Sequence, residues 1–483
     1  MPRSTRALVV GAVTGALGVL FALTPLGLAL ERGVGLSGLF LLRGPIEPPA
    51  DVVVVGIDRQ SAQRLDLPAP PRSWPRSVHA RLIESLADRG AAVIVLDLRL
   101  DIPTSEAEDA ALARAIAAAK RVVLFEHLER TSQVITGGDG RATGHLTVDR
   151  LAPPIPAFAG VAAGLGPFPL PKTPTRVDRF WTFSAAAGDV PTLPAVALLL
   201  YALDDAYDPL LALLRRAGMP DVDGLPPTRA DLAGADGVLG LCTTLRAALS
   251  ADPALGTRLA AALASAPAGA GGLTGAQRRL LRALADLHGG PDSRYVNLYG
   301  PPGSVRTISY HAVLADDGAP LDVDGKAVFV GFSDLFATET KEDSFPTVFS
   351  RPDGVDISGV EIAATAFANL LDGRSVRPTG APTTAALLLL VGGVAGAGAC
   401  LLPAPPAVLL TLLIAALYLA GAHLAFGQAD LWPPLAIPLL LQLPLALGWG
   451  LADRYRQVSR ERRNIDRGAR MYLPARLVQE LTG

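Results

Sequence analysis

The chain has 483 residues, of which 50% are hydrophobic and only 18% are charged, and its mean hydropathy is +0.36. Soluble globular proteins carry about 25% charged residues, so this composition indicates a membrane protein. The net charge of -2 excludes a broadly basic nucleic-acid binder, and the two isolated cysteines exclude a disulfide framework and a cysteine-based zinc site.

The first hydrophobic segment is long enough to cross a bilayer. Residues 7–30 contain no Asp, Glu, Lys or Arg. At ~1.5 Å per residue, a helix of this length measures about 36 Å, against a hydrocarbon core of ~30 Å. A cleaved signal peptide is the alternative, but its apolar region is typically only ~7–15 residues. We therefore expect a first transmembrane helix over 7–30, after a cytoplasmic N-terminus over 1–6.

The next segments predict strands and helices in alternation. Asp51-Val-Val-Val-Val-Gly-Ile-Asp58 is a short apolar run typical of a buried parallel strand. It is followed by a helix, a strand, a helix and a strand, over 76–89, 92–97, 106–120 and 121–125. This order predicts the start of a parallel, doubly wound α/β sheet.

The middle of the chain is less regular. We expect a strand over 177–186 and a helix over 193–203, and then a helical insertion over about 205–290. Regular order returns with strands over 295–300 and 327–332 and a helix over 359–371. These patterns predict one α/β domain over 31–378, with a parallel doubly wound sheet interrupted by the insertion.

A second charge-free stretch, residues 378–429, predicts two more membrane helices. It breaks at Leu402-Pro403-Ala404-Pro405-Pro406, which favours helices over 383–402 and 406–426. A last transmembrane helix is expected over 431–452, where Pro438 and Pro444 predict kinks or local unwinding. Four transmembrane α-helices result.

Two glycine patterns lie inside these apolar helices. Gly11-xxx-Gly15 belongs to the first and Gly392-xxx-Gly396 to the second. We interpret both as small-residue faces that let helices pack closely, and not as fragments of nucleotide-binding loops.

Basic residues near the helix ends predict the topology. Arg3 and Arg6 precede the first helix, and the tail over 453–483 is rich in arginine, whereas acidic residues outnumber basic ones between 31 and 378. Because cytoplasmic flanks carry the excess of basic residues, both termini are expected in the cytoplasm and the α/β domain outside. The predominance of arginine over lysine, with abundant Ala, Gly and Pro, is typical of a high-GC bacterial genome, so we expect the bacterial cytoplasmic (inner) membrane.

The tail carries a heptad-like seam of apolar or small side chains, interrupted by Arg462. Its members are Leu451, Tyr455, Val458, Ile465, Ala469 and Tyr472. This spacing predicts a signalling helix that pairs with its twin in a parallel homodimer, through the tail and the membrane helices. The alternative is a basic juxtamembrane helix that lies on anionic lipid.

Five segments together resemble an extracellular sensor of the CHASE type 2 (CHASE2) family. They are DVVVVGID, WPRSVHARLIESLADRGAAVIVLDL, YVNLYGPPGSVRTISYHAVL, GKAVFVGFSD and GVEIAATAFANLLDGRSV, within residues 45–378. The resemblance implies one anchor helix before the sensor and three after it. It also implies a cytoplasmic output module, which in this family is a class III nucleotide cyclase, a histidine kinase or a serine/threonine kinase.

The last residues resemble the segment that leads into a class III adenylate cyclase domain. This segment is Met471-Tyr-Leu-Pro-Ala-Arg-Leu-Val-Gln-Glu-Leu481. The catalytic parts of such a cyclase would lie downstream of Gly483, so no catalytic residue is assigned. The chain as given is expected to be no enzyme and to hold no cofactor and no metal.

Candidate ligand-binding residues lie where predicted strands end, because open α/β sheets place their crevice at the carboxyl ends of the strands. Acids and guanidinium groups gathered there could clamp a small polar ligand by charge-assisted hydrogen bonds. The alternative is an internal network of ion pairs or helix caps. The candidates are Asp58, Arg72, Trp74, Arg76, Asp97, Arg99, Asp101, Ser333 and Asp334.

A second candidate is the acidic loop with Glu339, Glu342 and Asp343, whose oxygens suit a hard cation but which is equally typical of a solvated surface. The six histidines show no ligand spacing, and we expect His79 and His311 to pack or cap within helices.

The leading hypothesis is a membrane-anchored sensory receptor that detects an unknown extracytoplasmic ligand or protein and signals to a cytoplasmic output, with adenylate cyclase favoured. One alternative is the membrane half of an adenylate cyclase that makes cyclic AMP when complete. Another is a non-catalytic envelope protein. A transporter is disfavoured, because His423 is the only titratable group expected within the membrane. The expected partners are the lipid bilayer and a second copy, and no nucleic acid.

Overall fold

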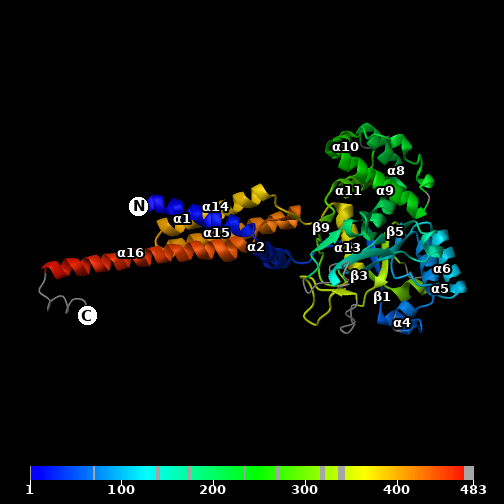
Figure 1. Cartoon of the computed structure of the whole chain (residues 1–483), viewed down its shortest axis with the longest axis horizontal. Coiled ribbons are helices and arrows are strands. Elements are labelled where there is room, and N and C mark those ends of the chain that lie inside the picture. The colour runs from blue at the N-terminus through cyan, green and yellow to red at the C-terminus, as the bar shows by residue number, and fades with distance from the viewer. Residues whose placement is uncertain are drawn as a thin grey trace. The chain divides into compact units, whose positions relative to one another are not determined.

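The protein is described from a computed structural model, which covers residues 2–68, 71–136, 142–170, 176–232, 234–267, 272–315, 321–334 and 343–472. The chain divides into two compact units (Figure 1). One unit is residues 45–376, here called the α/β unit. The other combines residues 1–44 with residues 377–483 and is here called the helical unit.

The α/β unit is built on a seven-stranded, largely parallel sheet. Its order is β10-β1-β11-β2-β3-β4, with β5 also paired to β3. The central strands are β1 (Val52–Ile57), β2 (Val93–Asp97) and β11 (Ala327–Phe332), and β10 (Thr307–Ser309) forms one edge. All six residues of β1 and the first five residues of β11 are buried, as expected for parallel strands that are covered on both faces.

Helices cover both faces of this sheet. On one face, α5 (Arg76–Asp88), α6 (Glu106–Ala119) and α12 (Tyr310–Leu314) contribute Leu82, Ile116 and Tyr310 to a core with the strands. On the other face lie α13 (Gly359–Asp372) and α8 (Leu193–Arg216), where the Phe367 ring meets Phe329 and Tyr201 at centroid distances of 5.5 Å.

The structure departs from the sequence prediction at the third strand. β3 (Val122–Thr136) continues far beyond residue 125 and pairs in antiparallel fashion with β4 (Ala142–Ala152). The sheet is therefore mixed and not wholly parallel. The sequence of this hairpin beyond residue 125 contains no continuous apolar run, so hydrophobic patterning does not signal it.

The expected strand over 295–300 is also shorter than predicted. β9 (Ser293–Tyr295) pairs with β6 (Arg179–Trp181), outside the main sheet, and Tyr295 also forms an isolated bridge with Val376. The backbone N–H of Asn297 donates instead to the side chain of Asn369 in α13, at 2.7 Å. The side chain of Asn369 thus takes the place of a neighbouring strand as the hydrogen-bond partner of the Asn297 backbone.

In its described residues, the insertion contains three α-helices besides α8, namely α9 (Gly234–Ala251), α10 (Pro253–Ser265) and α11 (Gly275–Gly289). In Figure 1 these helices gather on one side of the sheet, and the short α4 (Arg59–Arg64) lies on the opposite side. The smaller elements are α7 (Pro156–Ala159), β5 (Gly164–Pro167), β7 (Phe183–Ser184), β8 (Val190–Pro191), β12 (Ser344–Phe345) and β13 (Ile357–Ser358).

The helical unit holds four helical segments that are long and apolar enough to cross a membrane, among the residues that the structure describes. They are Arg3–Ala22, Pro25–Arg43, Ala381–Leu401 and Ala404–Ala429. The first is α1, the third α14 and the fourth α15, whereas the second combines α2 (Pro25–Leu30), a π-helix (Glu31–Leu36) and α3 (Ser37–Arg43). The chain is therefore a membrane protein.

Two boundaries in this unit differ from the predicted spans. The helix expected over 7–30 is broken at Leu23 and Thr24, because the Thr24 hydroxyl caps a new helix by accepting from the Gly27 N–H at 3.0 Å. The predicted last span over 431–452 is not among the four membrane-length segments, and its helix begins later than residue 431. Leu431 and Trp432 form β15 with β14 (Arg377–Pro378), and a π-helix over Ile437–Gln442 precedes α16 (Leu443–Tyr472). This π-helix contains Pro438, so the predicted local irregularity is present.

The two glycine patterns face each other where α1 meets α14. A Cβ added at Gly11 would lie 2.6 Å from the Gly393 carbonyl oxygen, and one added at Gly392 would lie 2.7 Å from Gly15. The interpretation of these glycines as a packing face is confirmed.

Candidate functional site

A polar crevice lies at the carboxyl ends of three neighbouring strands. β10, β1 and β11 are adjacent and parallel, so the residues that follow them meet at one edge of the sheet. The crevice has a volume of about 280 Å³, and we call it the strand-end crevice. It is lined by Asp58, Arg59, Gln60, Gln63, Thr307, Ser309, Ser333 and Asp334.

Asp58 is held rigidly at the floor of this crevice. One carboxylate oxygen accepts from the Ser61 N–H at 2.6 Å and caps α4, and the other accepts from the Ser309 hydroxyl at 2.7 Å. The side chain thus joins the ends of β1 and β10. A carboxylate has about four acceptor positions, so Asp58 keeps capacity for a ligand that donates hydrogen bonds.

Ser333 approaches β1 closely because residue 56 is a glycine. A Cβ at Gly56 would lie 2.9 Å from the Ser333 carbonyl oxygen. The Ser333 N–H donates to the Ile57 carbonyl at 3.2 Å, and its hydroxyl oxygen accepts from Ser358, the N-cap of α13, at 3.2 Å. The next residue, Asp334, accepts from the Arg59 N–H at 3.3 Å.

The loop before β10 is held by a buried glutamate. Both carboxylate oxygens of Glu361 accept from the Gly303 N–H, at 3.0 and 2.9 Å, and one accepts from the Val305 N–H at 3.2 Å. Burial raises the pKa of Glu361 although these backbone N–H groups favour its ionised form. Glu361 lies in the first turn of α13, so the start of this helix contacts one lining residue, Ser333, through Ser358 and holds the loop that leads into β10 through Glu361.

Asp97 lies at the end of β2 but does not line the strand-end crevice. It sits against Gly331 of β11 and near Asp343. Burial and then the neighbouring Asp343 carboxylate raise the pKa of Asp97 to about 8. Asp343 in turn lies beside Gly359 at the start of α13. Glu339 and Glu342, proposed with Asp343 as a cation-binding loop, lie outside the described residues.

The predicted residues of the loops after β1 and β2 lie elsewhere and do not line the strand-end crevice. Arg99 is half exposed and donates to Asp101 at 2.6 Å, and this bond lowers the pKa of Asp101. Arg76 is buried, donates to the Ile102 carbonyl at 3.3 Å and lies 3.9 Å from Asp109. These residues form an ion-pair network, and Arg72 is exposed.

Trp74 belongs to the core beneath α5. Its side chain is 3% exposed, its indole N–H donates to the Pro68 carbonyl at 2.7 Å, and its ring meets Tyr310 edge to face. His79 lies beside it, 2.8 Å from the Tyr310 hydroxyl, and burial lowers the pKa of His79 to about 4. His311 shares two contacts with the Ser61 hydroxyl at the start of α4. Packing and capping therefore account for both histidines, as expected.

Five lining residues escaped the sequence prediction: Arg59, Gln60, Gln63, Thr307 and Ser309. The first three lie on α4, a helix of six residues that is too short for a periodic pattern. Its one signal is the N-cap Asp58. The other two lie on β10, a strand of three residues that joins the sheet only through β1.

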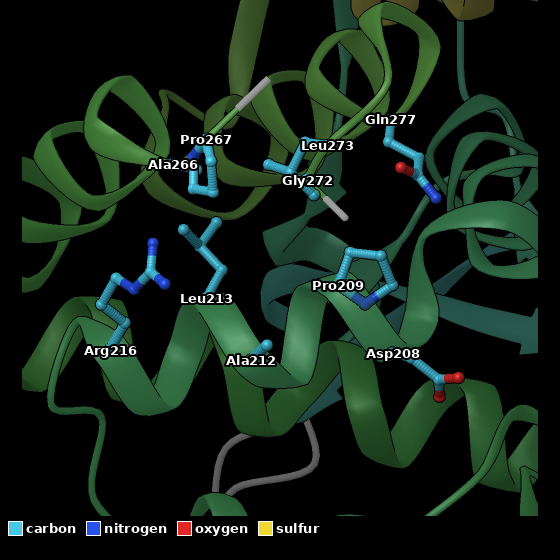
Figure 2. A pocket seen from close by; sticks show the side chains of 10 residues that line it. All are labelled: Asp208, Pro209, Ala212, Leu213, Arg216, Ala266, Pro267, Gly272, Leu273 and Gln277. Carbon is cyan, nitrogen blue, oxygen red and sulfur yellow. The ribbon is translucent and has the colours of Figure 1, made fainter. Parts of the chain in front are cut away.

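A second cavity of about 370 Å³ lies within the insertion (Figure 2). It separates α8 from the residues around Pro267 and Leu273, and its lining mixes aliphatic side chains with Asp208, Arg216 and Gln277. Gln277 is already engaged in the cap of α11. No part of the predicted site lies there.

A family model described as the CHASE2 domain matches residues 12–399, which is most of the chain. No curated protein and no solved structure matches the chain significantly.

Proposed function

We propose that this chain, which belongs to the CHASE2 domain family, is a membrane receptor whose strand-end crevice binds a small polar ligand. CHASE2 is a sensory domain, and the four membrane-length helices agree with a receptor held in a bilayer. The observation that carries the proposal is that the start of α13 contacts the lining residue Ser333 and the loop that leads into β10, and that α14 is the next helix in the chain.

The lining of the crevice restricts the ligand. Among the described residues it offers two carboxylates, one guanidinium, two amides and three hydroxyls, and no aromatic or aliphatic side chain. Its volume is at the lower limit for small-molecule pockets, which begin at about 300 Å³. The proposed ligand is therefore small and hydrophilic and donates several hydrogen bonds, as amino acids, polyols and amines do.

Signal transfer requires that the ligand bind one arrangement of α13 better than another, because equal affinity for two states shifts neither. Ser333 and Ser309 contact the ligand in this proposal. A shift of Ser333 would then reach the start of α13 through its hydrogen bond with Ser358. A shift of β10 would reach it through the loop that Glu361 holds. A coupling free energy of about 1–3 kcal/mol is typical of such switches.

Ligand binding is tested with the full chain in lipid nanodiscs. A panel of amino acids, polyols and small amines is screened for an upward shift of the melting temperature. Gln63→Ala, on the crevice wall, is expected to reduce the shift caused by a positive compound, whereas Arg64→Ala is not, because Arg64 is exposed on the same helix and does not line the crevice. Equal shifts in both variants would contradict binding in the crevice.

The proposed topology places residues 31–378 outside a bacterial cytoplasmic membrane, with both termini in the cytoplasm. The arginine-rich tail and the acidic balance of the α/β unit support it. Alkaline phosphatase fused near residue 200 should be active, and the same fusion near residue 470 should be inactive. The reverse pattern would exclude the receptor proposal.

The proposed output is a cytoplasmic module, with adenylate cyclase favoured by the resemblance of residues 471–481.

The proposed assembly is a homodimer paired through α16. Three members of the seam are exposed on this helix, namely Leu451, Tyr455 and Val458 at 45%, 77% and 51%. A cysteine at residue 455 should cross-link two copies in membranes, whereas one at residue 454, where Arg454 binds the end of α14, should not. The alternative of a non-catalytic envelope protein predicts no change of cyclic AMP when a positive compound is added to cells.

A further inference from the structure

A charged residue lies buried in the helical unit, where the sequence predicts none. Glu31 belongs to the π-helix within the membrane-length segment Pro25–Arg43, and it is only 7% exposed. Burial of a carboxylate is costly unless hydrogen bonds compensate the loss of water, so its partners are decisive.

The partner of Glu31 is the backbone at the start of the last membrane segment. Its carboxylate accepts from the N–H groups of Leu435, Ala436 and Ile437, at 2.8, 3.2 and 2.7 Å. Pro433 and Pro434 precede these residues, and the helix that starts here has no earlier turn to bond its first N–H groups. Because these N–H groups are buried in the helical unit, one carboxylate satisfies three donors that would otherwise be unpaired.

Glycines shape the space for this contact. A Cβ at Gly35 would lie 2.2 Å from a Glu31 carboxylate oxygen and 3.5 Å from the Ala436 nitrogen, and one at Gly38 would lie 3.3 Å from the Leu435 side chain. Both backbones are also π-helical here, over Glu31–Leu36 and Ile437–Gln442. π-Bulges of this kind occur often at functional sites.

The two joined segments have different continuations along the chain. Residues 25–43 lead directly into the α/β unit at Pro45, and residues 437–442 lead into α16 and the tail. We propose that Glu31 is a latch that ties the start of the last membrane helix to the segment entering the α/β unit, so that a movement of that segment moves α16.

The latch is tested by hydrogen–deuterium exchange of the full chain in nanodiscs. Glu31→Ala should speed exchange at the amides of residues 435–437 by about tenfold or more, since a hydrogen bond to a charged group is worth about 1.5–3 kcal/mol. Glu31→Gln keeps one carbonyl acceptor and should give an intermediate rate. The matched control is Arg32→Gln, because Arg32 is the adjacent, exposed residue, and it should leave these amides unchanged.

A second measurement separates a latch from a merely stabilising contact. A spin label at residue 455 of α16 should show a broader distribution of positions in Glu31→Gln than in the parent or in Arg32→Gln. If Glu31→Ala fails to fold, Glu31→Gln decides alone. Unchanged exchange at 435–437, or an unchanged label signal despite faster exchange, would overturn the proposal.

Discussion

Each of the two units contains a buried glutamate that accepts backbone hydrogen bonds, but the two glutamates hold different structures. Glu361 in the α/β unit and Glu31 in the helical unit are both buried, and each accepts backbone N–H bonds from a distant part of the chain. Neither of these sets of bonds involves an arginine or lysine. The difference lies in what is held: Glu361 fixes a loop beside the strand-end crevice, whereas Glu31 fixes the start of a helix in a membrane-length bundle. In both units, therefore, a buried carboxylate can order a stretch of backbone that has no hydrogen-bond partner in a helix or sheet.

Removal of the Glu361 carboxylate has the largest expected effect and tests whether the two buried carboxylates act independently. Glu361→Ala leaves the N–H groups of Gly303 and Val305 unpaired, and we expect a loss of about 3 kcal/mol in the free energy of unfolding, at ~1–3 kcal/mol for each unsatisfied group. Hydrogen–deuterium exchange should rise at residues 303–305 and stay unchanged at 435–437. Equal changes in both places would show that the two carboxylates are not independent.

The packing of the helical unit offers a second test. Gly11→Leu forces a side chain against the Gly393 backbone, so we expect the full chain in detergent to lose about 1–3 kcal/mol of stability. Gly393→Ala is the control, because a Cβ at that position would meet no atom within 4 Å. A similar melting temperature for Gly11→Leu and the parent would contradict the close contact of α1 and α14.

Asp97 should make the stability of the α/β unit depend on pH, which distinguishes this unit from the helical unit. Its pKa is about 8 in the folded protein, against 3.8 as the ordinary value, so the folded state binds the extra proton between these limits. Stability should therefore fall as pH rises from 5 to 8, by up to about 1.4 kcal/mol per pH unit for one proton. Asp97→Asn should flatten this dependence in denaturant unfolding.

Asp101→Asn is the matched control for Asp97, because the Arg99 hydrogen bond lowers the pKa of Asp101. Its contribution is present at neutral pH and is lost as pH falls below the ordinary range of an aspartate. The variant should therefore leave the slope between pH 5 and 8 unchanged. A parent protein with no slope in that range would show that Asp97 is ionised.

The smallest expected effect concerns the crevice itself. Ser309→Ala removes the hydroxyl that donates to Asp58 and should cost about 1 kcal/mol of stability. Thr307→Val is the companion variant, since the Thr307 hydroxyl donates only to the nearby Val305 carbonyl. If the crevice binds a ligand through Asp58, Ser309→Ala should weaken binding more than Thr307→Val in the melting-temperature assay.

Long, regular elements were predictable from the sequence and short ones were not. β1, β2, β11, α5, α6 and α13 begin and end within a few residues of the predicted ranges, because each combines a buried apolar pattern with a polar or glycine boundary. The β3–β4 hairpin and α4 lack such a pattern. Of the nine candidate site residues, the structure brings Asp58, Ser333 and Asp334 together.

The other candidates show why adjacency to a strand end is insufficient. Trp74 is drawn into the core by its large apolar surface, and Arg76 is drawn toward Asp109, so neither reaches the crevice. Asp97 ends a strand of the same sheet, but its side chain lies against Gly331 and near Asp343. Whether such a residue lines the crevice depends on the direction of its side chain and on the charged residue beside it. Other parts of the chain set both.

The sequence by itself determined the presence of membrane-length apolar helices and the alternation of strands and helices, because both depend on the local spacing of apolar residues. The resemblance of five segments indicated the family. Only the tertiary structure decided the partners of Glu31 and Glu361, the union of Asp58 with Ser309, and the break at Thr24. The contacts of the two glutamates and the contact of Asp58 with Ser309 join residues that lie from 56 to 406 positions apart. No local pattern encodes such pairs, since the bonds form only when packing brings an unpaired backbone N–H or hydroxyl to a buried carboxylate.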